Sequence, residues 1–279
     1  RLPQTMRFSC SIADQGSVES LARLLAGAAK ICRGKAGLKI TKTYIEVHSA
    51  DPMRDGGNWL SMRLTPTSIF STYAFTGMSE ESPVIMMEIE LGKLSEILSS
   101  GQGHTRIKLF NKKMALDVQK PHLLLEMRET HTIHHLPVCI VRDTHWATYE
   151  RPVLAEPKLS IFLPCLRTLL KTLHAFKSMR SKYVTLEGKT DGKFSAVAQQ
   201  EQSRTAVYFP DGVIESQSTD IATFRTKLVL KSLLSFLTAF HFAGSHRPVL
   251  NIISERTAQF GLNVDDAEVS FVLGVVIAE

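Results

Sequence analysis

Two short segments contain residue types that could bind a metal or act as a nucleophile, and each lacks a necessary companion. His131, His134 and His135 form an H-x-x-H-H pattern, but neither a Cys nor a Glu-x-x-His motif accompanies it. Its spacing suits the end of a strand better than a helix face. Cys139 lies near His145 without a third residue to orient the pair, which favours a structural thiol. The sequence therefore predicts no metal site, no cofactor and no catalytic residue.

Gly101-Gln102-Gly103 is similar to a phosphate-binding loop only in composition. Such a loop follows a strand and begins a helix, whereas an expected helix precedes these glycines. The segment is interpreted as a helix stop followed by a turn. Carboxylates at a spacing that would suit an acid and a base do not stand out either. An enzyme would need clustered polar residues in a cavity, and the sequence does not display them.

The elements that would position functional residues occur twice. The sequence matches itself at the offset that aligns Met87 with Thr226. At this offset, a segment of alternating apolar and polar residues and the short apolar helix after it both match a second copy in the other half of the chain. A strand and a long helix near the N-terminus are matched in the second half in the same way. The repeat predicts an α+β protein of two equivalent domains, with helices on one face of antiparallel sheets. We expect them at residues 6–135 and 158–279, joined by a connector at 136–157.

Length and composition agree with two folded domains. The chain has 279 residues, of which 44% are hydrophobic and 22% charged, enough for two separate cores. Four scattered cysteines do not make a secreted disulfide framework and favour a reducing compartment, the cytoplasm or nucleus. Apolar runs fall short of the about 18 residues of a membrane span. Met6 is expected to begin the natural chain, with the five preceding residues added to it.

Basic residues recur on the outer faces expected for the two long helices. Ser17 is expected to cap the first of them, and Val18 and Leu21 begin its buried stripe. The basic positions away from the buried stripes are Arg23, Lys30, Arg33, Arg167, Lys171 and His174. Glu19 lies among the basic residues of the first helix and reduces the positive charge of that face. Arg167, Lys171 and His174 of the second helix have no acidic i,i+4 partner among them. These basic faces are interpreted either as a binding surface or as an ordinary solvated surface. A net charge of +6 does not decide between the two interpretations.

The two shorter helices expose mainly small polar residues. Lys93 and Ser95 are expected to face outward from the first, and Lys231 and Ser235 from the second. Each helix could therefore approach a partner closely while contributing one cation.

The segment between the domains is rich in proline. Pro137, Pro152 and Pro157 resist regular strand pairing, so the connector is expected to lie on the surface. Its apolar and aromatic residues argue against disorder. Trp146 either anchors the connector to its own domain, which is favoured, or contacts a partner.

Three stretches carry a resemblance to a known family. They are Met6-Arg7-Phe8, Ile107-Lys108-Leu109 and the segment from Leu159 to Lys171, which reads LSIFLPCLRTLLK. With the doubled unit and the connector, they resemble the PCNA-like sliding clamps, and most closely the Hus-type subunit of the heterotrimeric nine-one-one checkpoint clamp. The resemblance covers the chain from Met6, although the loops at 49–58 and 211–222 depart from the family pattern.

The resemblance implies a ring of three such chains around duplex DNA, with sheets outside and helices inside. The basic residues Arg23, Lys30, Arg33, Lys93, Arg167, Lys171, His174 and Lys231 would then face DNA and attract its phosphates without reading its sequence. It further implies a non-catalytic subunit that is nuclear and also cytoplasmic. Two other clamp subunits, a clamp-loader ATPase, and repair and checkpoint proteins would be its partners, and a membrane would not. A homotrimeric replicative clamp is the alternative.

The resemblance also implies two kinds of protein contact. Neighbouring subunits would pair through sheet edges expected at 123–127 and 205–209, represented by Leu123, Leu124, Leu125, Thr205, Val207 and Phe209. Partner peptides would bind an apolar groove beside the connector, for which the candidates are Ile140, Val141, Val275 and Ile277.

Overall fold

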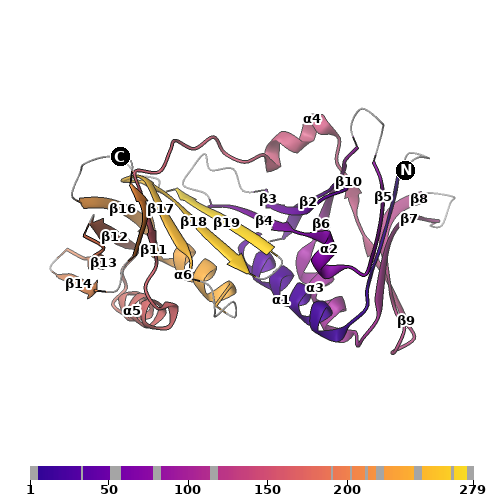
Figure 1. Ribbon diagram of the computed structural model, residues 1–279, viewed down its shortest axis with the longest axis horizontal. Coiled ribbons are helices and arrows are strands. Elements are labelled where there is room, and N and C mark those ends of the chain that lie inside the picture. The colour runs from indigo at the N-terminus through magenta and orange to yellow at the C-terminus, as the bar shows by residue number, and fades with distance from the viewer. Residues whose placement is uncertain are drawn as a thin grey trace. The chain divides into compact units, whose positions relative to one another are not determined.

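A computed structural model of the chain divides into two compact units (Figure 1). The structure describes residues 6–32, 34–50, 58–77, 83–113, 119–189, 191–201, 203–210, 213–217, 223–241, 247–264 and 267–274. The first unit comprises the chain up to Ala50 and the segment from Ser61 to Glu150. The second unit comprises Asp51–Leu60 and the residues from Arg151 onward. These divisions do not test the predicted domain boundaries, which stay predictions.

The first unit contains two antiparallel sheets and two principal helices. One sheet has the order β5-β1-β7-β8-β9, and the strands of the other follow the order β10-β6-β2-β3-β4. The bounds of the first sheet are Thr72–Thr76, Arg7–Ile12, Thr105–Lys113, Gln119–Met127 and Thr132–Pro137 in that order. Those of the second are Cys139–Ile140, Ile85–Glu90, Lys35–Ile40, Ile45–Ser49 and Asn58–Leu64. The helices are α1 (Gln15–Cys32), the short α2 (Pro66–Ile69) and α3 (Leu91–Ser100).

The second unit repeats this arrangement. Its strands follow the orders β15-β11-β17-β18-β19 and β14-β13-β12-β16. The bounds of the first set are Val213–Gln217, Leu159–Phe162, Val249–Ser254, Thr257–Val264 and Ala267–Gly274. Those of the second are Arg204–Phe209, Phe194–Gln199, Tyr183–Lys189 and Thr223–Val229, and the helices are α5 (Leu166–Ser178) and α6 (Leu230–Ala239).

The principal helices and strands of the two units correspond, while α2 and β10 occur in the first unit alone among the described residues. This correspondence confirms the predicted α+β fold of two repeated domains. In each unit a strand runs directly into a ten-residue helix, β6 into α3 and β16 into α6. These helices begin at Leu91 and Leu230, the positions that the sequence repeat superimposes. The period-two pattern before each helix and the apolar stripe within it account for both elements.

The helices bury their apolar sides against the sheets. In the first unit Leu21 of α1 and Leu94 of α3 meet Leu38 and Val47 of one sheet and Ile107 of the other. In the second, Phe236 of α6 stacks on Phe271 of β19 with ring centroids 4.5 Å apart. Each unit therefore has an apolar core of its own.

Two predictions about the helices of the first unit were wrong. Ser95 does not face outward: it is 5% exposed, and its hydroxyl donates a 2.8 Å hydrogen bond to the Ala22 carbonyl of α1. Ser17 does not cap α1, because the helix begins two residues earlier. The Asp14 carboxylate instead accepts a 2.8 Å hydrogen bond from the Ser17 backbone N–H, an N-terminal cap that lowers the pKa of Asp14.

The segment 139–150 folds onto the first unit. Strand β10 pairs with β6, and helix α4 (Asp143–Trp146) leads into the 3-10 helix η3 (Ala147–Tyr149). Trp146 is 6% exposed and packs against Tyr149, with ring centroids 4.9 Å apart, and edge-on against His48. Trp146 is therefore an anchor of the connector to its own domain.

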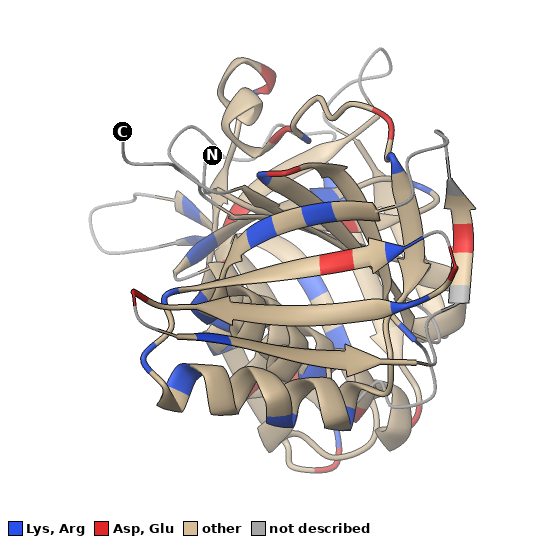
Figure 2. Cartoon of the chain, turned by 90° about the vertical axis from the view of Figure 1, so that its left-hand side faces the viewer, with Lys and Arg blue, Asp and Glu red and all other residues tan. Residues whose placement is uncertain are grey.

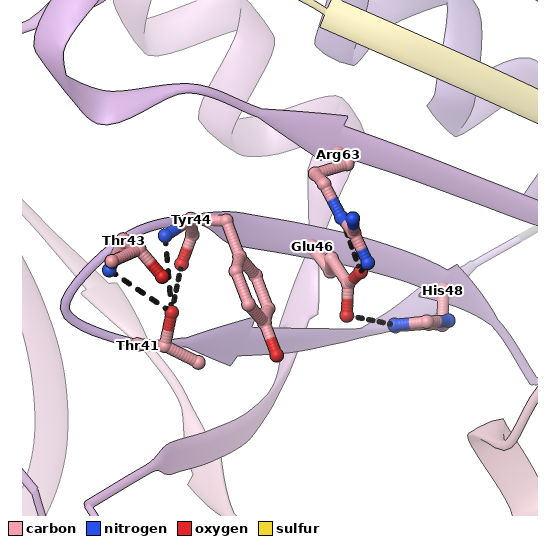
Figure 3. A network of polar contacts seen from close by, with 6 residues as sticks. All are labelled: Thr41, Thr43, Tyr44, Glu46, His48 and Arg63. Atoms are coloured by element: carbon pink, nitrogen blue, oxygen red, sulfur yellow. Dashed lines mark hydrogen bonds and ion pairs between the residues drawn. The ribbon is translucent and has the colours of Figure 1, made fainter.

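The face of the β6-β2-β3-β4 sheet that this segment covers also holds a buried carboxylate (Figure 3). Glu46 is 7% exposed, and its carboxylate accepts a 2.7 Å hydrogen bond from Arg63 Nε. His48 Nε2 lies 3.4 Å from the second carboxylate oxygen. Burial acts to raise the pKa of Glu46, but the hydrogen bonds and positive charge of His48 and Arg63 outweigh it and lower that pKa to about 2.

Candidate nucleic-acid interface

The candidate interface is formed by a pair of helices in each unit. Helix α1 packs beside α3 in the first unit, and α5 packs beside α6 in the second. Of the cations predicted to face DNA, those that the structure describes are exposed: Arg23, Lys30, Lys93, Arg167, Lys171, His174 and Lys231. Arg33 lies outside the described residues.

The two helix pairs differ in their acidic residues. Among exposed positions on the first pair, Glu19 lies on α1 and Glu96 on α3, and Lys93 forms a 2.6 Å ion pair with Glu90. The sequences of α5 and α6 contain no Asp or Glu at all. Figure 2 shows Lys and Arg in blue along α5, the helix at the lower edge of the view. The second pair is therefore the more uniformly cationic surface.

The start of α5 follows from its cap. Cys165 is the residue before the helix, and its carbonyl accepts hydrogen bonds from the N–H groups of Thr168 and Leu169. Pro164 therefore precedes the cap. Backbone hydrogen bonds from Thr168 and Arg167 to the exposed thiol lower the pKa of Cys165.

The prediction that residues 123–127 form an edge strand is wrong. Those residues belong to β8, which is paired on one side with β7 and on the other with β9. Leu123 and Leu125 point into the core, and Leu124 is partly buried on the other face. The strand that ends the sheet is β9, whose histidine-rich sequence hid its strand character. On the other unit Thr205, Val207 and Phe209 lie in β14, an edge strand of its sheet.

The predicted partner groove is only partly described. Val141 is 6% exposed and packs with Met86, Trp146 and Tyr149, so its side chain is not accessible to a peptide. The nonlocal packing against Met86 is the reason, since the local sequence gives no sign of it. Ile140 is partly buried, and Val275 and Ile277 lie outside the described residues.

The described residues show no cluster of side chains typical of a metal centre. Within them, no group of three His, Cys, Asp or Glu side chains could hold a metal ion. His134 and His135 are consecutive in β9, so their side chains point to opposite faces. A cavity of about 190 Å³ in the first unit is lined by Cys139 among others, but its charged residues pair with each other, Lys35 with Glu88 and Lys93 with Glu90.

None of the helices in the described part of the chain is both long and apolar enough to cross a membrane.

The paired sheets and helix pairs define the fold of a PCNA-like sliding clamp. The crystal structure of proliferating cellular nuclear antigen from Entamoeba histolytica is similar to the chain with a TM-score of 0.68 and 13% identity, covering 96% of this chain and 98% of that one. At this identity the likeness concerns the fold.

The chain belongs to the family described as Hus1-like protein, whose model matches residues 6–276. A human relative named checkpoint protein HUS1 is 24% identical over 280 residues, which is 95% of this chain and 98% of the relative. The resemblance to the Hus-type clamp subunit is thereby confirmed.

Proposed function

We propose that this chain is a non-catalytic subunit of a heterotrimeric sliding clamp that encircles duplex DNA in the DNA-damage checkpoint. The family match and the clamp fold support the proposal. The observation that carries the DNA contact is the exposure of Arg167, Lys171 and His174 on a helix without acidic residues. Such a surface attracts phosphates through long-range forces that do not depend on base sequence, which permits sliding.

Two different partner chains would complete the ring. The edge strands β14 and β9 support pairing with neighbours, because an exposed strand edge requires either a partner or protection. A clamp-loading ATPase would open and close the ring, and repair and signalling proteins would bind it in the nucleus. Ile140 and the C-terminal Val275 and Ile277 remain candidates for contacts with those proteins.

The test uses the chain co-expressed with its two partner subunits. Arg167→Glu together with Lys171→Glu should weaken binding of the ring to a duplex and reduce the slope of log K against log salt by about two, since each phosphate contact contributes about 0.9. Lys42→Glu, at an exposed lysine in the turn between β2 and β3, is the control. An unchanged slope in the double variant would contradict the assignment of α5 to the DNA-facing surface.

Light scattering on the chain alone distinguishes the heterotrimer from the homotrimeric alternative. A monomer that joins a ring only with its partners is expected. A stable trimer of this chain alone would instead support a replicative clamp.

A further inference from the structure

The face of the β14-β13-β12-β16 sheet opposite α6 carries a second basic surface. Exposed cations alternate on its strands with inward-facing core residues such as Leu186 and Leu228. The basic sheet face consists of Lys182, Arg204, Arg225 and Lys227 together with Glu187, Tyr183 and Tyr208. In Figure 2 the blue segments of these strands face the viewer, above α5.

Two arginines converge on one carboxylate at the centre of this face. Arg225 Nε lies 3.1 Å from Glu187 Oε1, and Arg204 Nη2 lies 3.8 Å from the same atom. The hydroxyl of Ser195 donates to the other carboxylate oxygen at 3.3 Å. One carboxylate cannot neutralise two guanidinium groups, so the centre keeps a positive charge. Both arginines are more than half exposed, which leaves their outer N–H groups available to an anion.

Aromatic rings lie among these cations. Lys227 Nζ and Lys182 Nζ lie 4.9 Å and 5.3 Å from the centroid of the Tyr183 ring. Tyr208 is 73% exposed, which is unusual for a large aromatic side chain on a sheet. The register places Tyr208 beside Ser195, Ser195 beside Glu187 and Glu187 beside Arg225. These three steps of about 4.8 Å span roughly 14 Å from the aromatic residue to the arginine.

We propose that the basic sheet face binds single-stranded nucleic acid without sequence preference. Sequence-independent single-strand binding combines cations that follow the backbone with aromatic rings on which bases stack, and this face carries both. Phosphates would contact Arg204, Arg225 and Lys227, while a base stacks on Tyr208. An exposed ring can stack only on an unpaired, splayed base, so the face suits a single strand better than a duplex, whose bases are already stacked on each other.

An acidic peptide would satisfy the cations but would give the exposed ring of Tyr208 no role. A peptide added as a strand to the edge of β14 would also leave Tyr183, two strands from β14, and Lys227, three strands from it, without contact. The proposal goes beyond the clamp function, because it concerns the opposite side of the sheet from the DNA-facing helices.

The test titrates a fluorescein-labelled oligothymidylate of about 15 nucleotides with the full chain and measures anisotropy. Tyr208→Ala should weaken binding at least about fivefold, the lower limit for loss of one stacked base. Tyr208→Phe keeps the ring and should retain binding within twofold. If Tyr208→Ala binds as tightly as the unchanged chain, the proposal is overturned.

A second pair of variants measures the charge contribution. Lys227→Gln should reduce the magnitude of the salt slope by about 0.7, the value of one phosphate contact on a single strand, whereas Lys42→Gln should not change it. Equal slopes would overturn the proposal, as would an oligoglutamate peptide that binds more tightly than the oligonucleotide. Arg167→Glu with Lys171→Glu should leave this binding within twofold, so failure here is distinguishable from failure of the clamp assignment.

Discussion

The same face of the two equivalent four-stranded sheets is used differently in the two units. In the first, α4 and η3 cover it, and Trp146 and Tyr149 pack over Gly37 and His48. In the second, the same face carries the exposed cations Arg204, Arg225 and Lys227 and the exposed ring of Tyr208. The connector is thus an addition to the repeat that occupies the first sheet. The two repeated units therefore share their apolar cores but differ on the sheet face that their helices do not cover.

Each of these faces contains a carboxylate neutralised by arginine. Glu46 is bound by Arg63 and His48 beneath the connector, while Glu187 lies between Arg204 and Arg225. The two carboxylate side chains are buried to a similar degree, at 9% and 12% exposure, so the carboxylates themselves do not distinguish the faces. The difference lies in the apolar cover of Trp146 and Tyr149, so the first face should contribute more to stability and the second more to binding.

The largest difference is expected when an aromatic residue is removed from each face. Trp146→Ala should lower the free energy of unfolding of the first unit by about 3–5 kcal/mol, the usual cost of truncating a buried tryptophan. Tyr208→Ala, at an exposed position, should change the free energy of unfolding of the second unit by less than about 0.5 kcal/mol. Urea unfolding measures both variants, with hydrogen exchange of the β2 and β3 amides reporting on the first unit and of the β12 and β13 amides on the second. Similar losses would mean that the two faces are not used differently.

Acid should weaken the covered face through Glu46. Its pKa is lowered from 4.5 to about 2 in the folded state, so its stabilising contribution is complete above about pH 4.5 and is lost as the pH falls toward 2. About 3 kcal/mol would be lost over that window, as expected for a shift of this size. Denaturant unfolding from pH 6 to pH 2 should show the loss, and Glu46→Gln should remove most of it. A variant with the same pH dependence as the unchanged chain would refute this role.

A smaller effect is expected where the connector approaches the sheet most closely. A Cβ atom at Gly37 would lie 2.6 Å from the Tyr149 ring and 2.9 Å from Trp146. Gly37→Ala should therefore destabilise the first unit by about 1–3 kcal/mol, measured by urea unfolding.

Gly92→Ala provides the matched control for Gly37→Ala. It lies within α3, where nothing stands within 4 Å of an added Cβ, and it should stabilise by about 0.5–1 kcal/mol. Destabilisation of both variants to the same extent would show that contact with the connector is not the cause.

The fold was largely predictable because its signals are local and occur twice. The alternating segments and apolar stripes around Leu91 and Leu230 define the same strand-to-helix step in each half, and each copy supports the other. Exposed cations of the helices followed from the same periodicity. Elements without a strong apolar pattern have no such signal: β9 was anticipated only as a strand end at its histidines, and η3 was missed.

The errors concern contacts that link distant parts of the chain. Ser95 looks like a surface residue until the carbonyl of Ala22 is brought beside it, and Val141 looks accessible until Met86 and Trp146 surround it. Whether a strand lies inside a sheet or at its edge depends on the next strand, so β8 was mistaken for an edge when β9 went unrecognised. The basic sheet face was also missed, because its members come from separate strands and from the turn before β12.

The edge position of β14 has a consequence for a cell that makes this chain. Among the described residues β14 pairs only with β13, so its other side offers backbone N–H and C=O groups to any extended polypeptide. A newly synthesised copy without its companions is then prone to misassembly and proteolysis. Subunits produced in excess should disappear, and the scarcest companion should set how many complete assemblies accumulate.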